Sequence, residues 1–413
     1  MSKTKKYPLP VAGIDVLSNE TSLVKGAVRS AKNVDIGRSG EYQRRAGYTM
    51  ASATPGLHSL YYAAQKGWTF VALDAQMFRL NTDTYARTPL ALIGSAFPVA
   101  YAEYNGNVYF TNRTSFNWVP SDSGAARQVG VPVPPAPTLS ATQGTLLPGT
   151  YGLVMTTIDD RGEESGATAL QTIRIGTGGG IKLAKLPLLP GMSLCVYITS
   201  ADGDVLRRAE TLPAVFHTYD IAEDAQGALC STQFLTPMPT GDMVRWHNGR
   251  LYTAKFDTLS FSEALRPHLY SLAHNTIQFS GWISFIEPVV DGIYVGDSRG
   301  VWFLAGGDPT KFTLRRVSTH RAIHRSSLIA PSRYFPEKMV QTDAPVAVWL
   351  STAGYIVGMQ GGSVVELHSD RIQVPTGLLG RSTLLLRDGR KQIITTVNST
   401  STAANGVATD STI

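Results

Sequence analysis

Short runs of alternating apolar and polar residues extend along most of the chain, and glycine, proline, asparagine or aspartate interrupts them every few positions. Alternation with a period of two residues is typical of half-buried β-strands. The longer period of an amphipathic helix is almost missing, and Pro267 interrupts the longest helical candidate, residues 259–272. The pattern therefore predicts an all-β protein.

One motif recurs along the chain: a turn that contains glycine leads into a strand of β-branched or aromatic residues. The glycines of its six copies are Gly67, Gly106, Gly249, Gly292, Gly354 and Gly389. In several copies another turn and strand follow, so each copy is interpreted as a meander of antiparallel strands. The copies at Gly67 and Gly106, at Gly249 and Gly292, and at Gly354 and Gly389 begin about 40 residues apart, and such repeats are typical of a β-propeller. A chance run of hairpins in a β-sandwich is the alternative interpretation.

The long interval between the second and third copies begins with a proline-rich segment, residues 131–137. Seven short β-prone runs follow, separated by Gly, Asp and Pro turns, which predicts an immunoglobulin-like or fibronectin III-like β-sandwich. The predicted fold is a six-bladed β-propeller-like ring of antiparallel meanders interrupted by this sandwich. The predicted parts are an N-terminal arm and hairpin (1–50), the first part of the propeller (51–133), the inserted sandwich (134–237), the second part of the propeller (238–398) and a low-complexity tail (399–413).

Composition adds an expectation about assembly. Only 16% of the residues are charged and 43% are hydrophobic, whereas soluble domains carry roughly 25% charged residues. Large contacts with other subunits would cover the uncharged surface, so we expect an assembly component. The net charge of +6 is mild for 413 residues, because nucleic-acid binders concentrate charge more strongly. No signal-peptide core and no membrane-spanning run is evident, so we expect synthesis in a cytoplasm.

The sequence contains no motif that predicts catalysis. Gly176–Gly180 lacks the Lys-Ser/Thr of a phosphate-binding loop and is interpreted as a turn between strands. Asp159, Asp160, Glu163 and Glu164 are interpreted as a solvated turn between the second and third sandwich strands, with a weak cation site as the alternative. No His or Cys spacing indicates a metal site. We expect no enzymatic activity, no cofactor and no metal.

Tryptophans divide into two groups by their surroundings in the sequence. Trp68, Trp302 and Trp349 lie in repeat strands, where large side chains are expected to fill the space between sheets. Trp118 and Trp246 lie in looser contexts and are interpreted as candidates for contact surfaces.

The hairpin of residues 33–48 is the first candidate interaction site. Its side chains Tyr42, Arg44, Arg45 and Tyr48 combine arginine with tyrosine, a mixture enriched at protein interfaces. We predict that this hairpin contacts a neighbouring subunit or an adaptor. An edge strand kept soluble by its arginines and a contact with DNA are the alternatives.

A second group of basic residues forms a candidate lumen-facing or inter-subunit patch. Its members are Arg315, Arg316, Arg321 and Arg325, with His320 and His324 between them. A solvated loop and a contact with nucleic-acid phosphate are the other interpretations.

Three segments resemble tail structural proteins of bacteriophages and prophages. Residues 13–48 contain the stretch N-x-x-x-L-x-x-G-x-x-R-x-A-x-N-V-D followed by a hairpin that ends in R-R-x-G-Y. Residues 148–166 resemble the fibronectin-like modules of these proteins, and residues 248–272 resemble the blade that follows the insert. The family is that of the tail nozzle, or tail tubular, proteins of short-tailed phages.

The resemblance implies a structural subunit of the virion tail, made in the cytoplasm of the host bacterium. Its ring would extend the channel of the portal and adaptor and let DNA pass during ejection. The implied partners are further copies of the chain in a hexameric ring, the head-to-tail adaptor, tail fibre or plug proteins, and transiently the phage DNA without sequence specificity. A receptor- or glycan-binding propeller of the tail is one alternative. A hydrolase of the sialidase type is another, and it requires an arginine cluster and a Tyr–Glu pair at the centre of the propeller.

Overall fold

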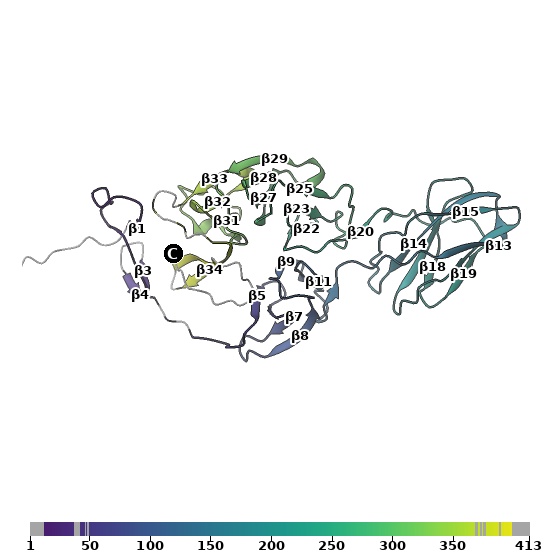
Figure 1. Cartoon of the computed structure of the whole chain (residues 1–413), viewed down its shortest axis with the longest axis horizontal. Coiled ribbons are helices and arrows are strands. Elements are labelled where there is room, and N and C mark those ends of the chain that lie inside the picture. The colour runs from purple at the N-terminus through teal and green to yellow at the C-terminus, as the bar shows by residue number, and fades with distance from the viewer. Residues whose placement is uncertain are drawn as a thin grey trace, which may run out of the picture.

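The computed structural model describes residues 12–36, 42–45, 47, 49–367, 371, 374, 377–387 and 390–398. The molecule is elongated, with the first strands at one end, a ring of sheets in the middle and a sandwich at the other end (Figure 1). Beside strands, the described residues form only three 3-10 turns: η1 (Pro309–Lys311), η2 (Ser332–Tyr334) and η3 (Gln360–Gly362). The all-β prediction is confirmed. In the described ranges no helix is long and apolar enough to cross a membrane.

Five four-stranded antiparallel sheets form most of the ring. The first consists of β5 (Leu57–Ala63), β6 (Trp68–Leu73), β7 (Gln76–Leu80) and β8 (Arg87–Leu92), and the second of β9 (Ala100–Tyr104), β10 (Asn107–Thr111), β11 (Phe116–Val119) and β12 (Arg127–Gln128). The third consists of β21 (Met243–His247), β22 (Arg250–Lys255), β23 (Thr258–Phe261) and β25 (Thr276–Gln278), and the fourth of β26 (Phe285–Val289), β27 (Gly292–Asp297), β28 (Gly300–Ala305) and β29 (Thr313–Ser318). The fifth consists of β30 (Leu328–Ala330), β31 (Val346–Ser351), β32 (Gly354–Gly358) and β33 (Val364–Glu366).

A sixth position in the ring is held by a two-stranded hairpin, β34 (Leu379–Arg387) and β35 (Arg390–Asn398). A further small sheet pairs β20 (Thr236–Pro237) with β24 (Leu269–Tyr270). Because the sixth position has two described strands where the others have four, the count of six blades stays a prediction.

Each repeated glycine turn falls in a different sheet. Four of the turns join the first strand of a sheet to its second, whereas the turn at Gly354 joins the second strand to the third. The turn at Gly389 lies outside the described residues. At Asn105-Gly106 and Asn248-Gly249 both residues have positive φ, as a two-residue turn that matches the right-handed twist of the strands requires.

Apolar clusters fill the spaces between neighbouring sheets, which makes the arrangement propeller-like, as predicted. Successive clusters join the first sheet to the second, the second to the third, the third to the fourth, the fourth to the fifth, and the fifth to the β34–β35 hairpin. No cluster of described residues joins that hairpin to the first sheet. As far as the described residues go, the ring therefore has one seam without an apolar core.

At this seam the first sheet has an apolar face, which we call the open face and define as Leu60, Tyr62, Val71, Phe78 and Leu80. Leu60 and Tyr62 are exposed, Phe78 and Leu80 are half-buried and Val71 is buried. Strand pairing puts Tyr62, Val71, Phe78 and Leu80 on one side of the sheet. Leu60 is 69% exposed and Tyr62 is 62% exposed. A hollow of ≈ 320 Å³ on this side is lined by Leu60, Val71 and Leu80.

The tryptophans mostly fill spaces between sheets. Trp349 is completely buried, and Trp68 and Trp302 pack against core clusters, as predicted. Trp118 lies in β11 and is only 7% exposed in the cluster between the second and third sheets. The prediction of a contact surface is therefore wrong for Trp118, because β11 continues the second sheet. Trp246 packs against the same cluster, with its ring centroid 3.8 Å from that of Tyr104.

The insert is a sandwich of two facing sheets with a core cluster between them. One sheet has the order β13 (Thr138–Leu146), β16 (Gly179–Ala184) and β19 (Thr218–Ile221), and the other has the order β15 (Gln171–Ile175), β14 (Gly149–Ile158), β17 (Ser193–Ile198) and β18 (Arg207–Pro213). In the immunoglobulin constant type the first two strands pair with each other, whereas here β13 pairs with β16. The immunoglobulin-like or fibronectin-like assignment stays a prediction.

The two ends of the insert lie side by side. A Cβ atom added to Gly130 would come within 2.8 Å of the Cβ of Pro237. The acidic turn between β14 and β15 lies at the same junction: Arg127 of the second sheet donates two hydrogen bonds to Asp160, at 2.6 and 2.7 Å. Arg161 pairs with Asp122 at 2.5 Å. Ion pairs to the ring therefore hold part of this turn, which the sequence had led us to expect in solvent.

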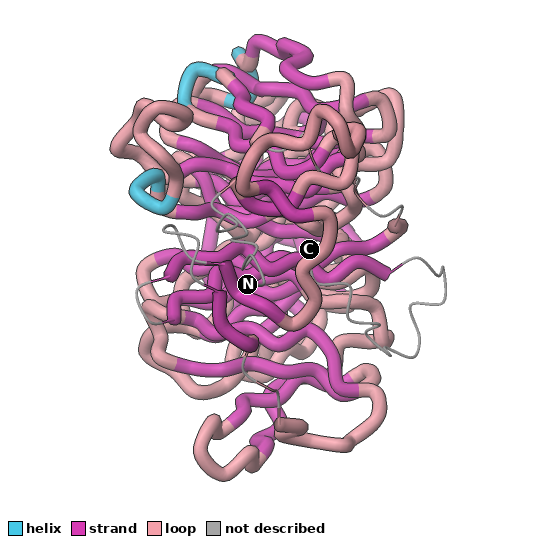
Figure 2. The backbone as a smooth tube through the Cα atoms, turned by 90° about the vertical axis from the view of Figure 1, so that its left-hand side faces the viewer, coloured by secondary structure: helices cyan, strands magenta, loops and turns pink. Residues whose placement is uncertain are grey.

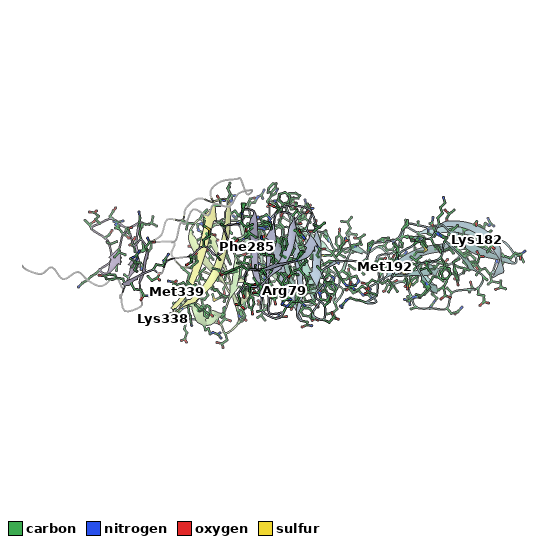
Figure 3. The ribbon with its side chains drawn as sticks, turned by 90° about the horizontal axis from the view of Figure 1, so that it is seen from below. Arg79, Lys182, Met192, Phe285, Lys338 and Met339 are labelled. Carbon is green, nitrogen blue, oxygen red and sulfur yellow. The ribbon has the colours of Figure 1, made fainter. Side chains whose placement is uncertain are left out.

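The described residues of the N-terminal arm, 12–36, 42–45, 47, 49 and 50, belong to none of these core clusters. The arm contains the parallel pair β1 (Gly13–Ile14) and β2 (Ala27–Val28) and the antiparallel hairpin of β3 (Val34–Ile36) and β4 (Tyr42–Arg44). Figure 2 views the molecule from the end at which this arm lies, and Figure 3 has Lys182 of the sandwich at the opposite end. Gln392 of β35 donates a hydrogen bond of 3.4 Å to Asp35, so the hairpin lies beside the sixth position of the ring.

Candidate functional site

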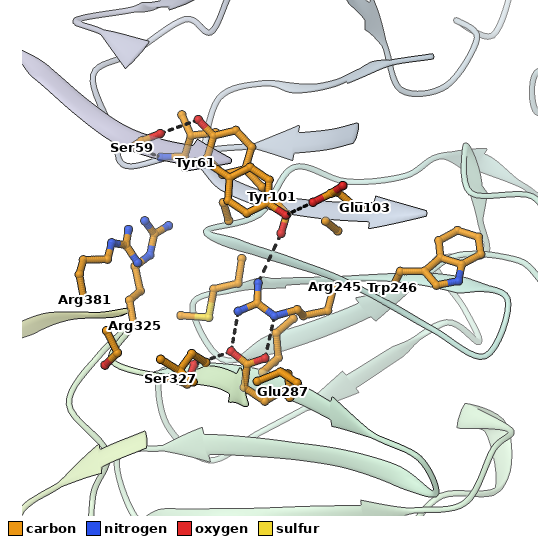
Figure 4. Close-up of a pocket in the computed structure, with 18 of the residues that line it drawn as sticks. Ser59, Tyr61, Tyr101, Glu103, Arg245, Trp246, Glu287, Arg325, Ser327 and Arg381 are labelled. Carbon is orange, nitrogen blue, oxygen red and sulfur yellow. Dashed lines mark hydrogen bonds and ion pairs between the residues drawn. The ribbon is translucent and has the colours of Figure 1, made fainter. Parts of the chain in front are cut away.

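A cavity of ≈ 520 Å³ lies at the centre of the ring. Residues from β5, β9, β21, β26, β30 and β34 line it, together with Arg325 just before β30. The cavity is therefore built by the innermost strand at every position of the ring, and its side chains come from segments far apart in the sequence (Figure 4). Arginine, glutamate, tyrosine and serine are all represented in its wall.

A buried ion pair links the third and fourth sheets across the cavity. Arg245 of β21 donates to both carboxylate oxygens of Glu287 in β26, at 2.9 and 2.5 Å. Ser327 donates a further hydrogen bond of 2.8 Å to Glu287, whose side chain is only 1% exposed. Burial alone would lower the pKa of Arg245, but the charge of Glu287 outweighs burial and raises it. The pair is thus ionised and electrically neutral as a whole.

Two stacked tyrosines and a glutamate form the opposite wall. The rings of Tyr61 and Tyr101 lie 4.5 Å apart and almost parallel. The Tyr61 hydroxyl donates to Glu103 at 2.7 Å, and the backbone N–H groups of Ala64 and Gln65 donate to the same carboxylate. Burial, followed by the hydrogen bond to Glu103, raises the pKa of Tyr61 above its ordinary value. Tyr61 is therefore a protonated donor at neutral pH, and Glu103 has three donors.

Two further arginines, Arg325 and Arg381, reach the cavity from the fifth sheet and the hairpin. Arg325 is 6% exposed and donates to the carbonyl oxygens of Pro98, at 3.1 Å, and Asp242. Burial and the charge of Arg381 lower the pKa of Arg325 to about 9. Solvent in the cavity reaches Arg381, yet the surrounding sheets and the charge of Arg245 lower its pKa to about 10. Neither arginine forms an ion pair with a described residue.

The predicted basic patch divides into separate places. Arg315 and Arg316 lie on β29, the outermost strand of the fourth sheet, and donate to the carbonyl oxygens of Gly361 and Arg299. Arg321 is exposed on a loop. Only Arg325 lines the central cavity, so neighbours in the sequence do not form one surface here.

The residues of the predicted interface hairpin also differ in their surroundings. Tyr42 is 67% exposed and Arg44 is exposed as well. Arg45 pairs with Asp35 on the opposite strand at 3.0 Å, and Tyr48 lies outside the described residues. Of the predicted interface residues that the structure describes, Tyr42 and Arg44 are thus the exposed ones.

Sequence reasoning missed most of the cavity residues. Tyr61, Glu103, Arg245, Glu287 and Arg381 lie on five different strands and share no motif. One usable signal was present: Glu103, Arg245 and Glu287 are charged residues inside otherwise apolar strand runs, where an unpaired charge would be costly. Together with Arg325, these side chains supply the arginine cluster and the Tyr–Glu pair that the hydrolase alternative requires.

No protein-family model matches the chain, and no curated protein matches it either. Among solved structures, it is similar to the WD40 domain of Neurospora crassa Pan2, with a TM-score of 0.34 and 11% identity over 84% of this chain and 86% of that one. It is also similar to the extracellular domain of a hybrid two-component system of B. thetaiotaomicron, with a TM-score of 0.30 and 12% identity over 85% of this chain and 39% of that one. TM-scores this low carry no argument, so the fold described above stands on the sheets of this chain.

Proposed function

We propose that this chain is a structural subunit of a bacteriophage tail ring. The observation that carries the proposal is the open face of the first sheet, beside a hairpin with two strands where the other positions have four. In a propeller each sheet has an apolar face that a neighbour covers. An exposed apolar face of this kind indicates a contact with another protein segment.

The N-terminal arm of a neighbouring copy is the segment that we propose for this contact. The arm exposes the apolar side chains Val16, Leu17 and Val24, which are 40%, 47% and 52% exposed. Its β3–β4 hairpin has the two strands that would bring the sixth position to four. Arms exchanged around a circle of copies would produce a closed assembly.

The proposed role follows from this assembly and from the sequence resemblance. A hexameric ring would extend the channel of the portal and adaptor, carry fibres or a plug, and let DNA pass during ejection. Its contact with DNA would be weak, because each phosphate neutralised by the protein adds affinity that opposes sliding. The subunit itself would act without catalysis.

The test is a double substitution on the open face, Leu60→Ser with Tyr62→Ser. Both side chains are largely exposed, so the free energy of unfolding of the variant should lie within about 0.5 kcal/mol of that of the wild type. Ring formation, measured by electron microscopy and by the mass of the purified assembly with and without the adaptor, should be lost. Deletion of residues 1–47 should have the same effect.

Leu170→Ser is the matched control, because Leu170 is also exposed, at 54%, but belongs to the sandwich. This variant should assemble like the wild type. Rings that form normally from both the double variant and the deletion variant would contradict the proposal.

One observation favours a second candidate, a glycosidase that acts on acidic sugars. Tyr61 donates to Glu103 at 2.7 Å in a cavity with three arginines, and sialidases use a tyrosine nucleophile. Tyr61 would bond to the anomeric carbon as the bond from that carbon to the aglycone oxygen breaks; Glu103 would accept the tyrosine proton, and the departing oxygen would take up a proton and leave as the alcohol. Water would then add to the anomeric carbon, release the sugar and return the proton to Tyr61. Release of the aryl alcohol from an aryl glycoside of an acidic sugar, lost in Tyr61→Phe, would establish this activity. No release by the folded protein would leave the ring subunit as the function.

A further inference from the structure

Two positive charges in the central cavity have no carboxylate partner among the described residues. The charge of Arg245 is matched by Glu287, and Glu103 is held by three N–H and O–H donors. Arg325 and Arg381 remain. Figure 4 shows their guanidinium groups next to each other; Arg325 is buried, whereas solvent in the cavity reaches Arg381. Two like charges at such a site repel each other and favour the binding of an anion.

Arg325 is held in place by several contacts. Its backbone has a φ of 62°, in the left-handed region that non-glycine residues rarely adopt. Its N–H donates to the carbonyl of Ser284 at 2.8 Å, and its guanidinium donates to two more carbonyls, on the loops before β9 and β21. Strain of this kind persists where the surroundings fix a residue, often at a ligand site. The fifth sheet thus presents a rigid positive charge.

Arg381 supplies the second charge in a different way. It lies on β34, and its side chain forms no hydrogen bond or ion pair with a described residue, so its donors are available. The hydroxyl groups of Ser327 and Ser382 lie in the same wall of the cavity. The Ser327 hydroxyl already donates to Glu287 and the Ser382 hydroxyl to the carbonyl of Ser326, so the arrangement combines one fixed guanidinium and one free guanidinium.

We propose that the central cavity binds a small molecule that carries an oxyanion, held between Arg325 and Arg381. A guanidinium group forms paired, charge-assisted hydrogen bonds with carboxylate or phosphate oxygens. A cavity of ≈ 520 Å³ lies within the usual range for small-molecule sites. The proposal does not depend on ring assembly, because none of these residues belongs to the open face or the arm. The oxyanion is the carboxylate of an acidic sugar or a phosphate group, and the experiment separates the two.

The experiment measures the thermal midpoint of the full chain with glucuronate, glucose or inorganic phosphate, with chloride keeping the ionic strength equal. A bound ligand raises the midpoint by mass action. We expect glucuronate or phosphate to raise it and glucose to leave it unchanged. In Arg381→Gln the affinity should fall about tenfold or more, because charge-assisted hydrogen bonds are lost. Without ligand, Arg381→Gln should be at least as stable as the wild type, since a repelling charge is removed.

Arg174→Gln is the matched control, because Arg174 is an exposed arginine of the sandwich. It should keep the full response. A response to glucuronate alone identifies an acidic sugar as the ligand class, and a response to phosphate identifies a phosphate-bearing one. No rise with either anion, or an equal rise in Arg381→Gln, would overturn the proposal. We expect Arg381→Gln to form rings normally. A loss of anion binding in this variant is then distinguishable from a failure of ring assembly.

Discussion

His324, next to the cavity arginine Arg325, stays neutral in the folded protein until the pH is strongly acidic. Burial, followed by the charge of Arg325, lowers its pKa from 6.5 to about 4, with smaller effects from Arg381 and Arg113 that Asp242 opposes. As the pH falls below 6.5, the unfolded chain takes up a proton at this residue and the folded chain does not. The contribution of this site to the free energy of unfolding is therefore fully present above pH 6.5 and is lost as the pH falls to about 4.

His324→Gln should remove this part of the pH dependence. The pKa difference corresponds to about 3 kcal/mol between neutral pH and pH 4. Urea unfolding of the wild type and the variant at several pH values in this window measures it. As the pH falls towards 4, the wild type should lose stability relative to the variant. A constant difference between the curves would show that His324 titrates alike in the folded and unfolded chain.

Glu287→Gln should lower the free energy of unfolding of the subunit more than the loss of any surface ion pair does. The substitution leaves the charge of Arg245 without a partner in the cavity, where the Arg245 side chain is 29% exposed. We expect a loss of about 3 kcal/mol, the lower end for a broken buried pair. Asp160→Asn breaks the exposed pair with Arg127 and should cost much less, because solvent screens exposed ion pairs. Equal losses in urea unfolding would contradict the assignment of a buried pair.

Individual residues differed in how far the sequence could place them. Trp349 was predicted correctly because an aromatic residue in a repeat strand has only the next sheet to pack against. Arg325 was grouped with Arg315 and Arg316, since sequence distance was the only available measure. Arg325 itself has a left-handed backbone conformation just before β30, and this conformation directs its side chain into the cavity instead. The second cavity arginine, Arg381, comes from another sheet, and no local sequence pattern predicts that the two side chains lie close together.

The inserted sandwich should be removable from the ring. Its core cluster shares no residue with the clusters of the ring, and Gly130 and Pro237 already lie against each other. Replacing residues 134–235 with a short Gly/Ser linker should leave a β protein that unfolds cooperatively, measured by circular dichroism in urea. Loss of cooperative unfolding would show that the sandwich supports the ring.

Strands and turns were the most predictable level, because the signals that define them are local. The Asn-Gly turns at 105–106 and 248–249 identify hairpins through a conformation that few other dipeptides adopt. The pairing of β13 with β16 depends instead on contacts between distant segments. A list of seven strands therefore predicted a sandwich but could not give its strand order.

For the whole molecule, Arg44 rather than Arg45 is the arginine that we expect to contact a neighbouring subunit. Arg45 pairs with Asp35 inside its own hairpin, whereas Arg44 is exposed. Arg44→Ala should weaken ring assembly or adaptor binding by about 1–3 kcal/mol and leave the melting of the monomer unchanged. Arg45→Ala should act mainly on the hairpin. Normal assembly of both variants would support a solubilising role, and a change confined to salt-dependent DNA binding would support a lumen-facing hairpin.

The adjacent ends of the insert also bear on the order of folding. β9 and β21 lie side by side in the ring, although the whole sandwich separates them along the chain. Closing so long a loop in an unfolded chain has a high entropic cost, which slows the pairing of distant strands. A sandwich that folds first, as it emerges during synthesis, brings residues 130 and 237 together and shortens the effective loop to that of a tight turn. The insert then works as an internal folding template, and the second half of the ring is added to a first half whose end is already in position.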